Sequence, residues 1–146
     1  MFRGNAPARI DDKGRLKVPN TFRSLLEGKY GRELFLTSLT GEYVRVYPMP
    51  VWLEVEQKLA GMPSSHASKL SFLHPLYYYG QAAELDVQGR VIIPVRLRDA
   101  ATMSGDVDVL GQVNYLDVWN HDRFLMRLQR EQYTDDDARA LAEFGI

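Results

Sequence analysis

Residues 11–19 read DDKGRLKVP, and residues 86–94 repeat the same pattern as DVQGRVIIP. At a constant offset of 75 positions, the identical pairs are Asp11/Asp86, Gly14/Gly89, Arg15/Arg90, Pro19/Pro94 and Arg23/Arg98. Each of these residue types makes up only about 5–7 % of an average protein, so five identities at one offset indicate an internal duplication. The fold can therefore be inferred outward from this stretch.

Each copy predicts a tight turn between two short strands. In the first copy, Asp11 can accept hydrogen bonds from the turn amides, and Gly14 can adopt a positive φ without steric cost. Arg15 then begins a return strand that ends at Pro19, which has no N–H for the ladder, and Asn20 is expected to cap a helix. The expected product is a rigid turn with one arginine at its exit. The alternative is a hairpin in which Asp11 and Arg15 only pair with each other.

The second copy is expected to fold in the same way, with Asp86, Gly89 and Arg90 shaping its turn. The surrounding pattern repeats too, because residues 1–60 and residues 81–130 each predict the order β-turn-β-α-β-β-α. Neither half has enough strands to close a core by itself. We therefore expect an α+β fold in which two halves, related by a pseudo-two-fold axis, complete one β-barrel flanked by helices.

Aromatic residues support this alignment of the halves. Trp119 falls where Tyr47 falls, and Phe124 falls where Trp52 falls, after a loop that is three residues shorter in the second half. Gly28 and Gly31 are expected to mark the end of the helix that follows the first turn.

Two further segments lie outside the repeats: a connector at residues 61–80 and an acidic tail at residues 131–146. Pro75 is expected to kink or end any helix in the connector. The run Tyr77–Tyr79 is expected to pack between helix and barrel or between subunits, with a protein partner as the alternative. Asp135–Asp137 are expected to be solvated, with cation binding as the alternative, and the chain after Ala138 is expected to form a last helical turn or two.

Composition narrows the classes of function. The 146 residues contain no Cys, which excludes disulfides and thiol chemistry, and no apolar run approaches the ~20 residues of a membrane span. The start shows no apolar signal segment, so a cytoplasmic protein with no membrane partner is expected. Net charge is −1, yet residues 1–32 hold eight Lys/Arg against three Asp/Glu. Such asymmetry is typical of a surface that faces a polyanion.

An enzyme is not indicated. His66, His74 and His121 are scattered at spacings that match no common zinc site. The sequence also lacks a P-loop and a dinucleotide-binding glycine pattern. We therefore expect no catalytic residues, no metal site and no cofactor.

The two turns, the opening Met-Phe-Arg-Gly at residues 1–4, the segment from Val46 to Trp52 and the pair Val118-Trp119 resemble the MraZ family over roughly residues 1–130. The resemblance implies an AbrB-like barrel built from two SpoVT-AbrB-type repeats. It implies a bacterial, nucleoid-associated transcription regulator that binds short direct repeats in the promoter of the division and cell-wall gene cluster. It also implies ring-like homo-oligomers, and a first-repeat turn that touches DNA.

In this chain the DNA-contacting turn would be Lys13, Gly14 and Arg15. Arg15 is the candidate for a bidentate contact to guanine O6 and N7. Contacts to phosphates, which position a protein without reading sequence, are expected from Arg3, Arg9, Lys13 and Lys17.

The two copies differ in a way that suggests different roles. The second copy has Gln88 where the first has Lys13, and Ile92 where the first has Lys17. We expect the first repeat to face DNA and the second repeat to face another subunit. A protein-binding module of the antitoxin type remains the alternative to a DNA-binding regulator.

Overall fold

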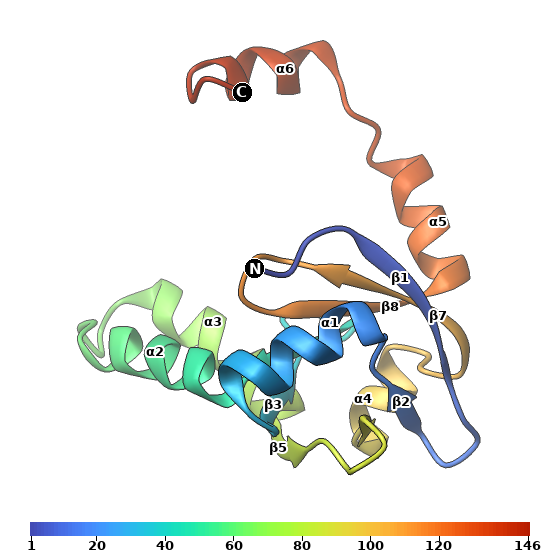
Figure 1. The fold of residues 1–146 in the computed structure, drawn as a ribbon. Coiled ribbons are helices and arrows are strands. Elements are labelled where there is room, and N and C mark those ends of the chain that lie inside the picture. The colour runs from blue at the N-terminus through green and yellow to red at the C-terminus, as the bar shows by residue number, and fades with distance from the viewer.

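The computed structural model describes all of residues 1–146 and contains one order of elements twice (Figure 1). The first half comprises β1 (Asn5–Ile10), β2 (Arg15–Lys17), α1 (Asn20–Leu25), β3 (Glu33–Thr37), β4 (Val44–Pro48) and α2 (Met49–Ala60). The second half comprises β5 (Gln81–Glu84), β6 (Arg90–Ile92), α4 (Val95–Ala100), β7 (Gly105–Gly111), β8 (Leu116–Asn120) and α5 (His121–Arg130). Helix α3 (Ala67–Tyr79) joins the halves, and α6 (Asp135–Ala142) ends the chain.

The strands form one antiparallel sheet in the order β5-β3-β4-β8-β7-β1-β2-β6. The turn after β5 leads directly into β6, and the N–H of Asp86 donates to the carbonyl of Arg90 at 2.9 Å, so the two ends of the sheet meet in a nearly closed barrel. Each half gives its first strand to the other: β1 pairs with β7, and β5 pairs with β3. This arrangement confirms the predicted AbrB-like α+β barrel.

The registers show the pseudo-two-fold axis directly. In the β2–β6 ladder Leu16 lies opposite Val91, and in the β4–β8 ladder Arg45 lies opposite Asp117. Each of these pairs joins corresponding positions of the two repeats, so the axis passes through the centres of both ladders.

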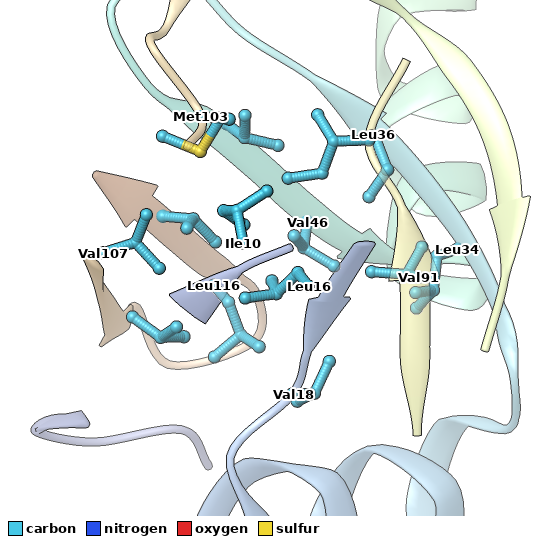
Figure 2. Packing of buried hydrophobic residues seen from close by; sticks show 14 of the residues in the cluster. Ile10, Leu16, Val18, Leu34, Leu36, Val46, Val91, Met103, Val107 and Leu116 are labelled. Carbon is cyan, nitrogen blue, oxygen red and sulfur yellow. The ribbon is translucent and has the colours of Figure 1, made fainter. Parts of the chain in front are cut away.

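The barrel interior is filled by buried aliphatic side chains from both halves (Figure 2). Ile10 and Leu16 from the first half meet Val91 and Val107 from the second. Full burial of one such side chain stabilises a fold by roughly 1.5–3 kcal/mol, so the shared core ties the two halves together.

A smaller apolar cluster lies outside the barrel, between α2 and α3. Tyr47, Val51 and Trp52 pack there with Leu76 of α3. The Tyr47 and Trp52 rings are 5.3 Å apart, and the Trp119 and Phe124 rings are also 5.3 Å apart. The predicted correspondence of these aromatic pairs is therefore confirmed.

The start of α1 differs from the prediction, and of the two glycines expected to end the helix only Gly31 does so. Pro19, not Asn20, occupies the N-cap position, and no side chain accepts a hydrogen bond there, because the fixed φ of proline already sets the entry into the helix. The helix also passes Gly28 through a π-helical turn at Leu26–Tyr30 and ends at Gly31, whose φ is +96°. Burial of Leu26 in the core outweighs the helix-breaking tendency of Gly28.

Pro75 does not end the connector helix, which was one of its two expected effects, because α3 continues through Pro75 to Tyr79. Proline removes one backbone donor, but Leu76 is completely buried and its carbonyl accepts a hydrogen bond from Thr37 Oγ1 at 2.7 Å. Tertiary contacts therefore hold the last turn. Within the single chain, Tyr79 packs against the barrel, whereas Tyr77 and Tyr78 are exposed. None of the helices is long and apolar enough to cross a membrane.

Candidate nucleic-acid interface

The first turn is organised by one carboxylate. Asp11 Oδ1 accepts hydrogen bonds from the backbone N–H groups of Lys13 at 3.0 Å and Arg15 at 2.9 Å, and Oδ2 accepts from Arg15 Nε at 2.6 Å. Gly14 sits at φ +79°, and its N–H donates to the Asp11 carbonyl at 3.0 Å. The predicted tight turn is present, and four hydrogen bonds keep it in one conformation.

The second turn repeats this geometry. Asp86 Oδ1 accepts from the N–H groups of Gln88 at 2.8 Å and Arg90 at 2.9 Å, and Oδ2 accepts from Arg90 Nε at 2.9 Å. Gly89 has a φ of +76°. Both turns are therefore built by the same residues in the same way.

Both aspartates are held in the ionised state. The hydrogen bond from the Arg15 N–H, helped by the Arg15 side chain, keeps the pKa of Asp11 below its ordinary value. The equivalent bonds from Arg90 lower the pKa of Asp86. Because ionised carboxylates accept stronger hydrogen bonds, the turns are most rigid well above the ordinary pKa of aspartate.

The Asp11–Arg15 pair forms, but it uses only one nitrogen of the guanidinium. Arg15 Nε contacts Asp11, whereas Nη1 and Nη2 have no hydrogen-bond partner in the chain, and 29 % of the side chain is exposed. The two free amino groups keep the fork geometry that suits guanine or phosphate. Lys13 is exposed at the tip of the same turn.

The two turns lie at opposite ends of one short ladder. Strand β2 pairs with β6 so that Arg15 faces Ile92 and Lys17 faces Arg90. Leu16 and Val91 point into the core, so these four side chains share the outward face. The sequence predicts different partners for the two repeats, but it does not show that their turns are joined by this ladder.

Three cations cross neighbouring strands in one row. Because Ile10 pairs with Leu16, the adjacent position Arg9 on β1 lies beside Lys17, and Lys17 in turn faces Arg90. Neighbouring strands are about 4.8 Å apart, so the row concentrates positive charge on a short stretch of the surface. Arg9 also pairs with Asp106 at 2.8 Å, which reduces its free charge.

The pseudo-symmetric surface of the second half has a different character. A hollow of about 340 Å³ beside β1 is lined by Arg9 and Lys17. Its counterpart of about 290 Å³ beside β5 is lined by Glu84 and Ile92 at the corresponding positions. Glu33 faces Glu84 across the β3–β5 ladder. Of these two hollows, only the one beside β1 is lined by cations.

Each turn is supported by an arginine from the other half. Arg23 donates from Nη1 to the carbonyl of Gln88 at 3.2 Å and from Nη2 to the carbonyl of Val87 at 3.1 Å. Arg98 lies against Gly14 but donates only to the carbonyl of Ile93, at 3.0 Å. The sequence shows that this arginine occurs in both repeats. It does not show that the arginine of each half lies against the turn of the other half.

The remaining sequence candidate, Arg3, lies away from this group. An isolated bridge between Phe2 and Val113 holds the N-terminus beside the loop after β7. Arg3 precedes β1, whose six residues span about 20 Å at ~3.3 Å per residue, and it therefore lies at the far end of this strand from Ile10. The structure brings together Arg9, Lys13, Arg15 and Lys17, but not Arg3.

The histidines occupy separate places. His66 caps α3 by accepting from the N–H of Ser68 at 3.3 Å, His74 is exposed, and His121 contacts Asp108 at 2.8 Å. No group of three or more His, Asp or Glu side chains is arranged to hold a metal ion.

Comparison with known proteins gives a consistent result. The family described as "MraZ protein, putative antitoxin-like" matches residues 1–74 and 79–144. Proteins named "Transcriptional regulator MraZ" are 46 % identical over 146 residues in Acidobacterium capsulatum and 44 % identical over 147 residues in Koribacter versatilis. In both cases the match covers 100 % of each chain. A protein of the same name in Moorella thermoacetica is 36 % identical over 146 residues, covering 98 % of this chain and 95 % of the relative.

Proposed function

This chain belongs to the MraZ family, and we propose that it is a transcriptional regulator that binds double-stranded DNA through the turn of its first repeat. One observation carries the proposal: Arg15 is fixed by Asp11 through Nε and keeps Nη1 and Nη2 free on a cationic surface. Fixing the side chain before binding reduces the entropy lost when DNA is contacted.

In the proposed complex the residues have distinct roles. Arg15 enters the major groove and bonds guanine O6 and N7, a contact that discriminates between bases by roughly 1–3 kcal/mol. Lys13, Lys17 and Arg9 contact phosphates. Gly14, expected from the resemblance to touch DNA, is buried against Arg98 and instead shapes the turn that presents Lys13 and Arg15. Arg3 would contact a phosphate further along the duplex, because it lies a strand length from the turn.

We propose that the DNA target is a set of short direct repeats in the promoter of the division and cell-wall gene cluster. One turn covers only a few base pairs, so a single chain binds weakly. Copies arranged in a ring would present several turns to successive repeats and gain about 10²–10⁴-fold in affinity.

The second repeat, residues 81–130, is proposed to contact another copy. Three exposed apolar side chains support this role: Val87 is 76 % exposed, Ile92 61 % and Val95 63 %. Val87 lies in the second turn, where the first repeat has Asp12, whereas Ile92 replaces Lys17 and lies opposite Arg15, and Val95 replaces Asn20. Because both turns share one ladder, DNA and the neighbouring copy would meet adjacent parts of one face.

A mobility shift on the DNA upstream of the protein's own gene tests the function. Arg15→Ala should abolish the shift, whereas Arg15→Lys should keep weak binding but lose discrimination, because lysine cannot bond guanine bidentately. Lys58→Ala is the control, since Lys58 is exposed on α2 away from the turns. An unchanged shift with Arg15→Ala, or loss of the shift only with Arg90→Ala, would contradict the assignment.

A protein-binding module is the second candidate. Tyr77 and Tyr78 are 60 % and 57 % exposed, and Arg96 lies over the Tyr78 ring at 4.3 Å beside a hollow of about 520 Å³. Such an exposed aromatic surface suits a protein partner. Co-purification with a second protein, together with no shift of the promoter DNA, would favour this candidate.

A further inference from the structure

Helix α5 of the second half has no helix packed over it, whereas its counterpart α2 is covered by α3. In the first half, α2 contributes Val51 and Trp52 to a small core that Leu76 of α3 closes. In the second half, α5 contributes no buried residue, and Leu125 and Met126 are 45 % and 59 % exposed. The pseudo-symmetric place of α3 is therefore empty.

The uncovered place is a hollow of about 260 Å³ beside α5. Its lining combines three arginines with one aromatic, one apolar and one acidic side chain: Arg123, Arg127, Arg130, Trp119, Met126 and Glu42. Arg127 is shared between Glu42 at 3.4 Å and Glu131 at 3.1 Å, whereas Arg123 and Arg130 have no acidic partner. The hollow thus fits a short segment that carries both negative charge and apolar side chains.

The chain contains one segment with that chemistry. The α6 arm, residues 135–146, starts with the three acidic side chains Asp135–Asp137 and ends with Phe144 and Ile146, which are 78 % and 81 % exposed. No residue of α6 is buried, and the hydrogen bonds of the arm stay within residues 134–146. An isolated helix of eight residues is marginal in water, so the arm needs a surface to pack on.

The path of the chain directs the arm away from its own α5. Figure 1 shows α6 standing apart from the barrel at the end of an extended connection. Glu131 is paired with Arg127 one turn earlier, and Thr134 is extended, with φ −118° and ψ 168°, and caps α6 through a capping box with Asp137. Along the sequence, α6 follows α5 as α3 follows α2, but it does not fold back as α3 does.

We propose that the hollow beside α5 receives the α6 arm of a second copy of this chain. The aspartates of the arm lie near Arg123 and Arg130, and Phe144 packs on the apolar surface around Met126. This interface is separate from the two turns. In it, the arm of the second copy packs on α5 as α3 packs on α2 within one chain.

The absence of cysteine makes a direct test clean, because any disulfide must come from introduced thiols. Met126→Cys and Phe144→Cys are made as separate chains, mixed in equal amounts and oxidised with glutathione disulfide. Docking predicts a Met126→Cys to Phe144→Cys cross-link that forms at least about tenfold faster than that of the control pair, because docking raises the local thiol concentration. The control replaces Met126→Cys with Glu54→Cys, the corresponding exposed position on α2.

Two results would overturn the proposal. One is a cross-link rate no faster than that of the control pair. The other is a doubly substituted chain that cross-links only within itself at every protein concentration, which would identify its own arm as the occupant. A charge exchange adds a second readout: Arg130→Glu should slow the cross-link, and Asp135→Arg on the arm should restore it. Because the test uses no DNA, its result does not depend on whether the proposed DNA-binding function is correct.

Discussion

Arg45 and Asp117 occupy the same position in the two repeats and face each other across the pseudo-two-fold axis. Arg45 Nε lies 2.9 Å from Asp117 Oδ1, and Nη2 lies 3.3 Å from Oδ2. The side chains are only 14 % and 7 % exposed, and the Arg45 guanidinium lies 4.3 Å from the Tyr115 ring centre. Burial alone would lower the pKa of Arg45, but the hydrogen bonds to Asp117 and its charge raise it. Two first repeats paired with each other would place arginine against arginine, so this pair favours the union of unlike halves.

Removing one member of this pair should be costly. Arg45→Ala or Asp117→Ala leaves a buried charge without a partner, which typically lowers the free energy of unfolding by about 3–5 kcal/mol. The exchanged variant Arg45→Asp with Asp117→Arg should recover most of that loss, as measured by urea unfolding. If the exchanged variant is as unstable as the single variants, the surrounding tyrosines, and not the ion pair, determine that arginine must occupy position 45 and aspartate position 117.

Gly14→Ala should destabilise the protein more than Gly4→Ala. Both glycines have positive φ, at +79° and +76°, where alanine costs roughly 1–2 kcal/mol. A Cβ at Gly14 would also overlap the Arg98 guanidinium, whereas a Cβ at Gly4 meets nothing within 4 Å. Thermal unfolding of both variants, with and without Arg98→Ala, separates the two costs. Equal destabilisation at the two glycines would contradict the close contact.

The cationic row should govern the salt dependence of DNA binding. Lys17→Ala removes one unpaired charge and should reduce the slope of log affinity against log salt by about one. Arg9→Ala should change the slope less, because Arg9 is already paired with Asp106. Titrations from low to physiological salt, with Lys58→Ala as the control, give these slopes. A slope unchanged by Lys17→Ala would remove this residue from the phosphate contacts.

His121 should make the attachment of α5 depend on pH. The hydrogen bond to Asp108 and the charge of Asp108 raise the pKa of His121, with smaller contributions from Asp122 and Asp106. A raised pKa in the folded state contributes stability that is complete below the ordinary value of about 6.5 and is lost as pH rises through the folded value.

Thermal unfolding between pH 5.5 and 8.5 therefore has a defined expectation. His121→Gln should be less stable than the original chain at pH 5.5, and the difference should shrink toward pH 8.5. Asp108→Asn should remove the pH dependence of this difference. A difference that widens with pH would contradict the assignment.

The duplicated stretch was sufficient to predict the fold, because a turn of the form Asp-x-x-Gly-Arg is determined locally. The Asp11 and Asp86 carboxylates bond to N–H groups within four residues, so their geometry follows from sequence. The aromatic alignment of Tyr47 with Trp119 was equally local to each repeat. The features that occur in both repeats could therefore be predicted from the sequence.

Features that depend on contacts between the halves could not be predicted in this way. The pairing of Lys17 with Arg90, the placement of Arg98 against Gly14 and the burial of Leu76 beside Pro75 all join residues far apart in sequence or override local preference. Spacing within one repeat carries no information about them. The same limit explains why the ladder that joins the two turns was not predicted.

The interleaving of the strands has a consequence for synthesis on the ribosome. Arg9 of β1 meets Asp106 of β7, so the first strand has no neighbour on that side until nearly the whole chain has been translated. At about 5–20 residues per second, an emerging first half waits several seconds with its strand edges open to other nascent chains. The first half therefore cannot mature as an independent module, and its sheet is completed only when the strands of the second half become available.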